Sequence, residues 1–140
     1  MMTSSGEVEV VVGVFLKRNQ FLVERRGFEE EIDPGIVCLP GGHVRKRESR
    51  EEALKREMLE ELGISVKKFR FICRNSYVAS NGERQNAYCY LITDYEGKPT
   101  CKSAQEIFWE DNIEDLSLEV DRKTIKRLKE LGASDRAKSE

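Results

Sequence analysis

Residues Gly42 to Ile64 have the sequence GHVRKRESREEALKREMLEELGI, and this stretch decides how the chain is interpreted. It predicts a helix over about residues 49–62. Ser49 with Glu52 three residues later is the pattern of a capping box, and Gly63 stands where a glycine commonly ends a helix. Three apolar residues spaced four apart give this helix a face to bury against a core: Leu54, Met58 and Leu62.

Carboxylates crowd the neighbouring side of the predicted helix. At about 100° per residue, Glu57, Glu60 and Glu61 fall within an arc of roughly 100°. Like charges this close repel each other, so the face must be either solvated or neutralised by a cation. Mg²⁺ suits the second case, because it prefers oxygen ligands and leaves room for substrate phosphates and water. Helix shape alone leaves both alternatives open, since charged helix faces are commonly just solvated.

The remaining sequence predicts strands around this helix and a second helix at the end. Before the helix we expect a valine-rich strand over residues 7–17, a turn at 18–19, a strand over 20–25, a loop over 27–35 and a short strand over 36–39 that ends at Pro40-Gly41-Gly42. After it we expect two long strands over 65–79 and 83–95 joined at Asn81-Gly82, a strand over 106–109 and a helix over about 121–131. This order predicts an α/β fold in one domain over residues 1–140, with flexible tails at 1–6 and 133–140.

The composition excludes several classes of protein. Its 24 Lys and Arg against 26 Asp and Glu leave a net charge of −2, which provides no basic field for binding nucleic acid. No apolar run is long enough to span a bilayer, and the first residues lack the features of a signal peptide. The four cysteines form no CxxC pair, which argues against a zinc site or a disulfide framework. We therefore expect a reduced, cytoplasmic protein without a membrane partner.

The spacing around the acidic helix resembles the complete signature of the Nudix hydrolases. Gly42 is followed after five residues by Glu48, and after seven more by the sequence REMLEELGI at residues 56–64. Further stretches that resemble the family are LPGG at 39–42, FLVERR at 21–26, and Trp109 with Leu116 near the end. Together they cover most of residues 7–131. The fold that the resemblance implies is the Nudix-type α/β/α sandwich with a mixed sheet.

The resemblance implies an enzyme that cleaves a nucleoside diphosphate linked to another group X, by attack of water on a phosphorus of the pyrophosphate bridge. The implied cofactor is Mg²⁺, with Mn²⁺ as a substitute. The implied metal ligands are Glu57, Glu60, Glu61 and the backbone carbonyl of Gly41, and in some members the residue matching Glu57 or Glu60 also helps to deprotonate the water. The implied catalytic residues are Glu57, Glu60 and Arg56, whose permanent charge orients the carboxylates. The implied supporting residues are Gly42 and Glu48, which assists from the loop.

Two further residues are candidates for contact with the substrate. Arg26 matches an arginine that contacts phosphate in MutT-type members, although an arginine at a strand end can also be purely structural. Glu106 lies in the late-strand region where many members place an extra carboxylate ligand or base. Glu96 and Glu110 compete with it for that position.

Weaker resemblances bear on the substrate. MutT-type enzymes act on nucleoside triphosphates, including oxidised ones, and this chain shares their size, Val12-Gly13 and Arg25-Arg26. This favours conversion of a nucleoside triphosphate to the monophosphate and pyrophosphate. One alternative is a coenzyme A diphosphatase, whose upstream pattern is incomplete because Gly27 and Glu31 replace its Ser and Arg. Another is an ADP-ribose diphosphatase, whose marker proline is replaced by Ala79.

Other classes of function would require different features of the sequence. A Nudix-fold module that senses a nucleotide without hydrolysing it has no need of the metal-site carboxylates, yet Glu57 and Glu61 are both present. Messenger-RNA decapping requires a basic groove that a near-neutral chain lacks. Isopentenyl-diphosphate isomerase is related in fold but depends on other residues and a longer chain. The expected partner is therefore a small nucleotide, and both a monomer and a homodimer are left open.

Overall fold

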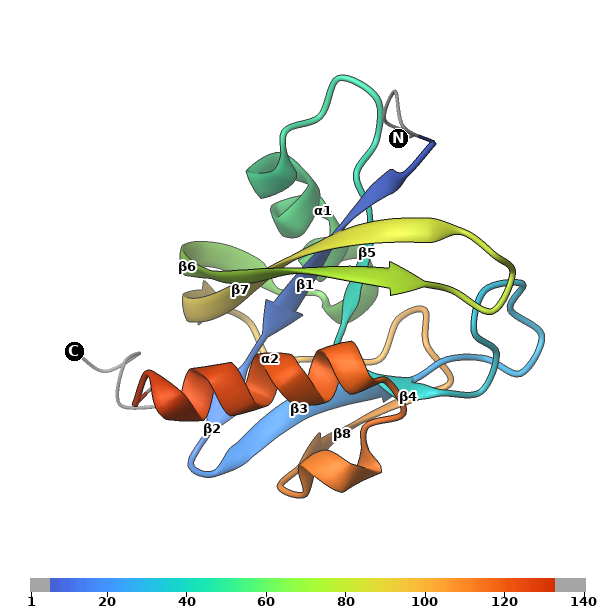
Figure 1. Ribbon diagram of the computed structural model, residues 1–140. Helices are drawn as coiled ribbons and strands as arrows, with labels where there is room; N and C mark the ends of the chain where they lie inside the picture. Colours follow the sequence, from blue (N-terminus) through green and yellow to red (C-terminus); the bar gives the residue numbers. More distant parts are fainter. Residues whose placement is uncertain (1–5, 133–140) are drawn as a thin grey trace.

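The computed structural model describes residues 6–132, whose strands form two sheets (Figure 1). The first sheet contains β5 (Gly41–His43), β1 (Val8–Val14), β7 (Arg84–Glu96) and β6 (Ser65–Val78), in that order. The second contains β2 (Leu16–Lys17), β3 (Gln20–Arg25) and β4 (Val37–Cys38), and β8 (Glu106–Glu110) also pairs with β3. Strand β1 runs parallel to β7 and antiparallel to β5, so the first sheet is mixed.

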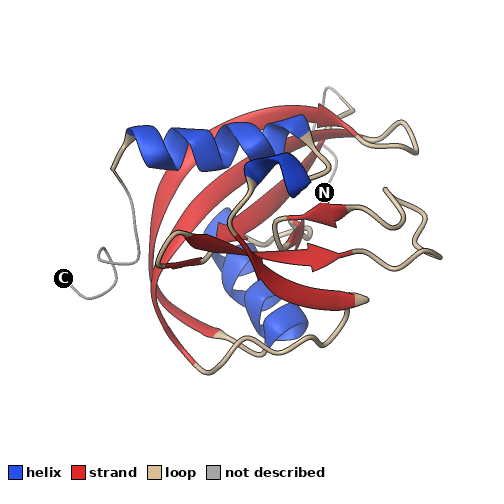
Figure 2. Ribbon diagram, turned by 90° about the horizontal axis from the view of Figure 1, so that it is seen from below, coloured by secondary structure: helices blue, strands red, loops and turns tan. Residues whose placement is uncertain are grey.

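Two helices lie on opposite sides of the strands (Figure 2). Helix α1 (Arg50–Leu62) packs on β1, β5 and β6, and helix α2 (Glu119–Glu130) packs on β6. Separate apolar clusters lie beneath them: Leu54, Met58 and Leu62 contribute to the cluster under α1, while Ile125 and Leu128 contribute to the cluster under α2. The predicted α/β sandwich with a mixed sheet is therefore confirmed.

Apart from shifts of one residue at the ends of several strands and of α1, the observed elements differ from the predicted ones in three places. The predicted first strand is divided at Phe15, because Phe15 is fully buried and its carbonyl accepts from the N–H of Leu22 at 3.1 Å. The chain does not leave the sheet at the double glycine, because residues 41–43 pair with β1 as β5. Helix α2 begins at Glu119, two residues before its predicted start, and a short 3₁₀ helix, Ile113–Asp115, precedes it.

The remaining predictions concern the ends of the chain and the membrane. The predicted flexible tails, apart from Gly6, lie outside the described residues. Within residues 6–132, the helices are too short or too polar to cross a bilayer.

The Asn81-Gly82 hairpin joins β6 and β7 as predicted, and Gly82 takes a φ of 89° that favours glycine.

Candidate active site

Helix α1 carries the acidic residues of the signature, and hydrogen bonds fix both of its ends. The hydroxyl of Ser49 accepts from the N–H of Glu52 at 3.0 Å, and the carboxylate of Glu52 accepts from the N–H of Ser49 at 2.8 Å. The predicted capping box is therefore confirmed. At the other end Gly63 has a φ of 69°, and its N–H donates to the carbonyl of Leu59 at 3.0 Å. Buried apolar residues on one face then fix the rotation of the helix: Ala53, Leu54, Met58 and Leu62.

A pocket of about 270 Å³ lies beside the acidic face of α1. Walls of this pocket also come from β3, from β5 and from the loop before β8. We call it the carboxylate pocket, and the lining residues used below are Glu24, Arg26, Gly41, Glu57, Glu60 and Glu61. The structure thus brings together all four residues that the resemblance implies as metal ligands.

The guanidinium group of Arg56 ties the carboxylates to the loop that precedes α1. Its Nε and Nη2 donate to the two oxygens of Glu48 at 2.6 and 3.0 Å. Its Nη1 donates to Glu57 at 2.8 Å and to Glu60 at 3.2 Å, and Nη2 also donates to the carbonyl of His43 at 2.9 Å. These hydrogen bonds hold the pKa of Glu48 down at about 2 and raise the pKa of Arg56. Arg56 and Glu48 therefore form a permanently charged support for the pocket.

The two glycines of β5 allow neighbouring groups to approach the strand closely. A Cβ atom at Gly42 would lie 2.2 Å from the carboxylate carbon of Glu57 and 2.4 Å from both of its oxygens. A Cβ atom at Gly41 would lie 2.2 Å from the carbonyl oxygen of Val11, on the adjacent strand. Gly42 thus makes room for a side chain of the pocket, whereas Gly41 makes room for the sheet itself.

Glu24 belongs to the carboxylate pocket, although the sequence patterns did not single it out. It lies in β3, is 3% exposed, and shares a hydrogen bond with Glu61. The sequence signal that could have found it is a charged residue that directly follows three apolar residues in a strand, because burial of that strand leaves such a residue in need of a buried partner.

Burial raises the pKa of both Glu24 and Glu61, and their mutual repulsion raises that of Glu61 further. The negative charge of Glu57 acts in the same direction on both groups. Because two carboxyl groups share one hydrogen bond, one of them carries a proton when no cation is bound. The carboxylates of the pocket therefore carry more negative charge than the positively charged side chains around them neutralise.

The donor set of the carboxylate pocket fits a hard divalent cation. Carboxylate oxygens and a backbone carbonyl are the donors that Mg²⁺ prefers, and Oε2 of Glu24 is buried with no hydrogen-bond partner among the described residues. Within residues 6–132, no group of three or more Asp, Glu, His or Cys is already arranged to hold a metal ion. Glu57 is turned to Arg56 and Glu61 to Glu24, so binding has to be accompanied by rotation of these side chains.

The two candidate substrate contacts lie in different surroundings. Arg26 lines the carboxylate pocket, where its Nε donates to the carbonyl of Ile32 at 2.8 Å and its Nη2 lies 3.8 Å from Glu30. The side chain of Glu106 is 56% exposed, accepts from Nε of Arg25 at 3.2 Å, and does not line the pocket. The structure therefore places Arg26 beside the acidic residues and Glu106 away from them.

A second cavity, of about 140 Å³, adjoins the carboxylate pocket, and Glu24, Arg26 and Gly41 line both. We call this cavity the inner pocket. Its apolar walls come mainly from β1 and from the residues around β4, and α2 contributes the buried side chain of Asp121. The carboxylate of Asp121 accepts from the N–H of Leu39 at 3.2 Å, and burial raises its pKa to about 7. The inner pocket thus has mainly apolar walls, with Asp121 as one of three carboxyl groups that line it.

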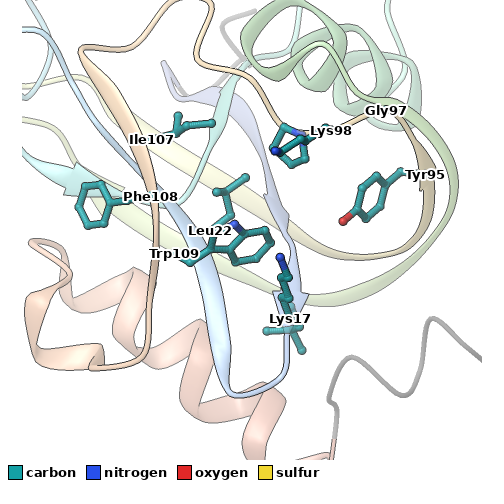
Figure 3. Close-up of a pocket in the computed structure, with 10 residues that line it drawn as sticks. Lys17, Leu22, Tyr95, Gly97, Lys98, Ile107, Phe108 and Trp109 are labelled. Carbon is teal, nitrogen blue, oxygen red and sulfur yellow. The ribbon is translucent and has the colours of Figure 1, made fainter.

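A larger open pocket of about 730 Å³ lies against β8 and the end of β7 (Figure 3). Trp109 and Tyr95 contribute aromatic rings to it, and the ammonium group of Lys17 lies 5.6 Å from the centre of the Trp109 ring. None of the residues that line it is acidic. This pocket therefore lacks the donors that phosphate hydrolysis with a divalent cation requires.

Comparisons with known proteins identify relatives in both sequence and fold. The 8-oxo-dGTP diphosphatase of Buchnera aphidicola subsp. Schizaphis graminum is 29% identical over 101 residues, which cover 71% of this chain and 74% of that protein. An isopentenyl-diphosphate Delta-isomerase of Saccharopolyspora erythraea is 30% identical over 139 residues, covering 86% of this chain and 71% of the isomerase. The crystal structure of a MutT NUDIX hydrolase from Burkholderia pseudomallei superposes with a TM-score of 0.77 at 24% identity, covering 87% of this chain and 98% of the other.

The comparison with protein families extends over nearly the whole described structure. The model of the NUDIX domain matches residues 8–128, from the first strand to the second helix. The matched region contains both sheets, α1 and every residue of the carboxylate pocket. The chain therefore belongs to the Nudix family, as a hydrolase of the MutT type.

Proposed function

We propose that this protein is a Mg²⁺-dependent pyrophosphohydrolase that converts a nucleoside triphosphate, ordinary or oxidised, into the nucleoside monophosphate and pyrophosphate. The observation that carries the proposal is the junction of an acidic pocket with a mainly apolar one, at Glu24, Arg26 and Gly41. Such a junction suits a ligand that is polyphosphate at one end and aromatic at the other. The relatives named 8-oxo-dGTP diphosphatase support this substrate class.

At the phosphate end, we assign the cation to Glu57, Glu60 and Glu61 together with the carbonyl of Gly41. Bound Mg²⁺ supplies neutralising charge for the phosphates and lowers the pKa of a water molecule. Arg26 adds a fixed positive charge at the boundary of the two pockets, where it can pair with a phosphate oxygen. Arg56 acts through the carboxylates that it holds, and is therefore a positioning residue.

The reaction adds one water molecule across the bridge between the α- and β-phosphorus atoms. The water oxygen bonds to one phosphorus, the bridging P–O bond breaks, and the bridging oxygen leaves with the electron pair on the other phosphate. One proton of the water passes to a carboxylate of the pocket. We assign this role to Glu57 or Glu60, which both line the pocket and are both held by Arg56.

At the aromatic end, the inner pocket suits a nucleobase. Its volume of about 140 Å³ is below the roughly 300–1,000 Å³ of sites that enclose a whole ligand, so it would hold one ring system. Its apolar walls favour a planar base, and Asp121 offers an acceptor for a base that presents N–H groups, as guanine does. A guanine nucleotide is therefore our first choice of substrate.

A substrate panel with Mg²⁺, read out by mass, tests this function. The panel contains ordinary and oxidised nucleoside triphosphates, ADP-ribose, dinucleoside polyphosphates, coenzyme A and nucleotide sugars. It also contains isopentenyl diphosphate, because one relative bears the name of an isomerase. Reaction in ¹⁸O-labelled water shows which phosphorus is attacked, since the label appears either in the monophosphate or in pyrophosphate.

Two substitutions on the same helix sharpen the test. Glu57→Gln removes a carboxylate of the pocket, whereas Glu51→Gln removes an exposed carboxylate that does not line it. We expect metal-dependent release of pyrophosphate from a triphosphate, lost in the first variant and kept in the second. Tight nucleotide binding without turnover in all three proteins would refute hydrolysis, and turnover of another panel member would refute the substrate class.

A further inference from the structure

Glu24 occupies a position that the packing of β3 reserves for an apolar side chain. The residues before it, Phe21, Leu22 and Val23, are all at most 1% exposed, and Glu24 itself is 3% exposed. Alternate side chains of a strand share a face, so Glu24 projects toward the same side as Leu22, which belongs to the core under α1. A carboxylate at such a position needs a buried partner that compensates for its lost hydration.

The surrounding residues leave this compensation incomplete. Oε2 of Glu24 has no hydrogen-bond partner within residues 6–132. Other buried carboxylates of the described chain do have donors: Asp33 accepts from the hydroxyl of Tyr77 at 2.8 Å, and Asp121 accepts from the N–H of Leu39 at 3.2 Å. An orphaned buried oxygen is costly, and it persists where a ligand that is not part of the chain completes its contacts.

The pocket that faces Glu24 indicates what that ligand is. Glu24 lines the carboxylate pocket from β3, shares a hydrogen bond with Glu61 of α1, and also lines the inner pocket. Arg26 lines both pockets as well, but its Nε is bonded to the carbonyl of Ile32. A ligand that satisfies Glu24 must therefore attract several carboxylates at once, which is the property of a divalent cation.

We propose that Glu24 is a further carboxylate ligand of the divalent cation, supplied by β3 beside the carboxylates of α1. This inference rests on the proposed function, because it concerns the same cation. It also changes the expected location of an additional acidic ligand, since Glu106 in the late strand is exposed and bonded to Arg25. A cation held from β3 and α1 together would link the second sheet to the helix.

Binding of Mn²⁺ to the intact protein tests the proposal without any substrate. Free Mn²⁺ is measured by electron paramagnetic resonance during titration, and Mg²⁺ is measured by competition. Glu24→Gln keeps the shape of the side chain but removes its charge, Glu57→Gln removes an expected ligand, and Glu106→Gln is the matched carboxylate outside the pocket. Unfolding temperatures with and without the metal are measured for the same four proteins.

We expect Glu24→Gln to bind Mn²⁺ about 10- to 100-fold more weakly than the unchanged protein, while Glu106→Gln binds as the unchanged protein does. We also expect Glu24→Gln to unfold at a higher temperature than the unchanged protein without metal, because it removes a poorly compensated charge, and to gain less from Mn²⁺. A merely structural role predicts the opposite sign without metal. Unaltered Mn²⁺ affinity, or a lower unfolding temperature without metal, overturns the proposal.

The variants distinguish a failure of this inference from a failure of the proposed function on which it rests. If Glu57→Gln weakens binding and Glu24→Gln does not, the cation site stands and the role of Glu24 is refuted. If the unchanged protein fails to bind Mn²⁺, the proposed metal-dependent function fails and the inference fails with it.

Discussion

Replacing Gly42 by alanine should separate the folding of this protein from its activity. The new Cβ atom would lie 2.2 Å from the carboxylate carbon of Glu57, so this carboxylate has to withdraw by more than about 1 Å to reach an ordinary contact distance. The φ of Gly42 is not in the left-handed region, so alanine suits the backbone. The displaced group is the end of a flexible side chain, and the main loss is its 2.8 Å hydrogen bond to Arg56. We therefore expect destabilisation of only about 1–2 kcal/mol.

The expected effect on function is much larger. A displacement of about 1 Å in a catalytic group can cost about 100-fold in rate, so Gly42→Ala should lower kcat/KM for the best panel substrate by about that factor. Urea unfolding measures the stability, and pyrophosphate release measures the rate. Gly41→Ala is the contrasting variant, because its Cβ meets the carbonyl oxygen of Val11 and strains the sheet instead. Wild-type activity in Gly42→Ala, or destabilisation as large as in Gly41→Ala, would refute the reasoning.

Three further substitutions test the supports of the site. Arg56→Lys keeps the charge but loses the planar fork that contacts Glu48, Glu57 and Glu60, so urea unfolding should show a loss of about 2 kcal/mol; unaltered stability would contradict this. Burial raises the folded-state pKa of Asp121 to about 7, above its ordinary value, so between about pH 4 and 7 the folded protein keeps a proton that the unfolded chain has released. The resulting stability is fully present below about pH 4 and is lost as the pH rises through 7. Asp121→Asn should therefore gain up to about 4 kcal/mol over the unchanged protein across this range, and parallel stability–pH curves would exclude the effect. Ser49→Ala should lose about 1 kcal/mol with the α1 cap, measured by the same unfolding assay.

Local chemistry explains why most of the fold was predictable from the sequence. The bounds of α1 follow from its capping box and from Gly63, and each depends on residues within one helical turn. The long hairpin follows from Asn81-Gly82 in the same way. The division of the first strand at Phe15 and the pairing of residues 41–43 with β1 depend on partners distant in the chain, so periodicity within one segment could not reveal them.

The residues of the candidate site also fall into two groups, those placed by local spacing and those that depend on distant parts of the chain. Glu57, Glu60 and Glu61 share one helix face, so their spacing in the sequence already places them together. Arg26 and Glu24 reach the same pocket from another sheet, and no spacing rule connects β3 with α1. Arg26 is expected from its resemblance to a phosphate-contacting arginine, whereas Glu24 lies in the FLVERR stretch without a role that the resemblance implies.

Glu24 nevertheless had a physical signal in the sequence. Local rules agree with the fold over most of β3, where Phe21, Leu22 and Val23 are strand-forming and apolar, and the rule fails at the next residue. Sequences tend to violate such rules where function requires it, because the cost is offset only if the residue serves a ligand or a reaction. A charge in an apolar strand that leads to the pocket is therefore a stronger indication of function than a charge on a solvated helix face. By this criterion, the sequence indicates a functional role for Glu24 more strongly than for Glu106, which lies exposed at the start of its strand.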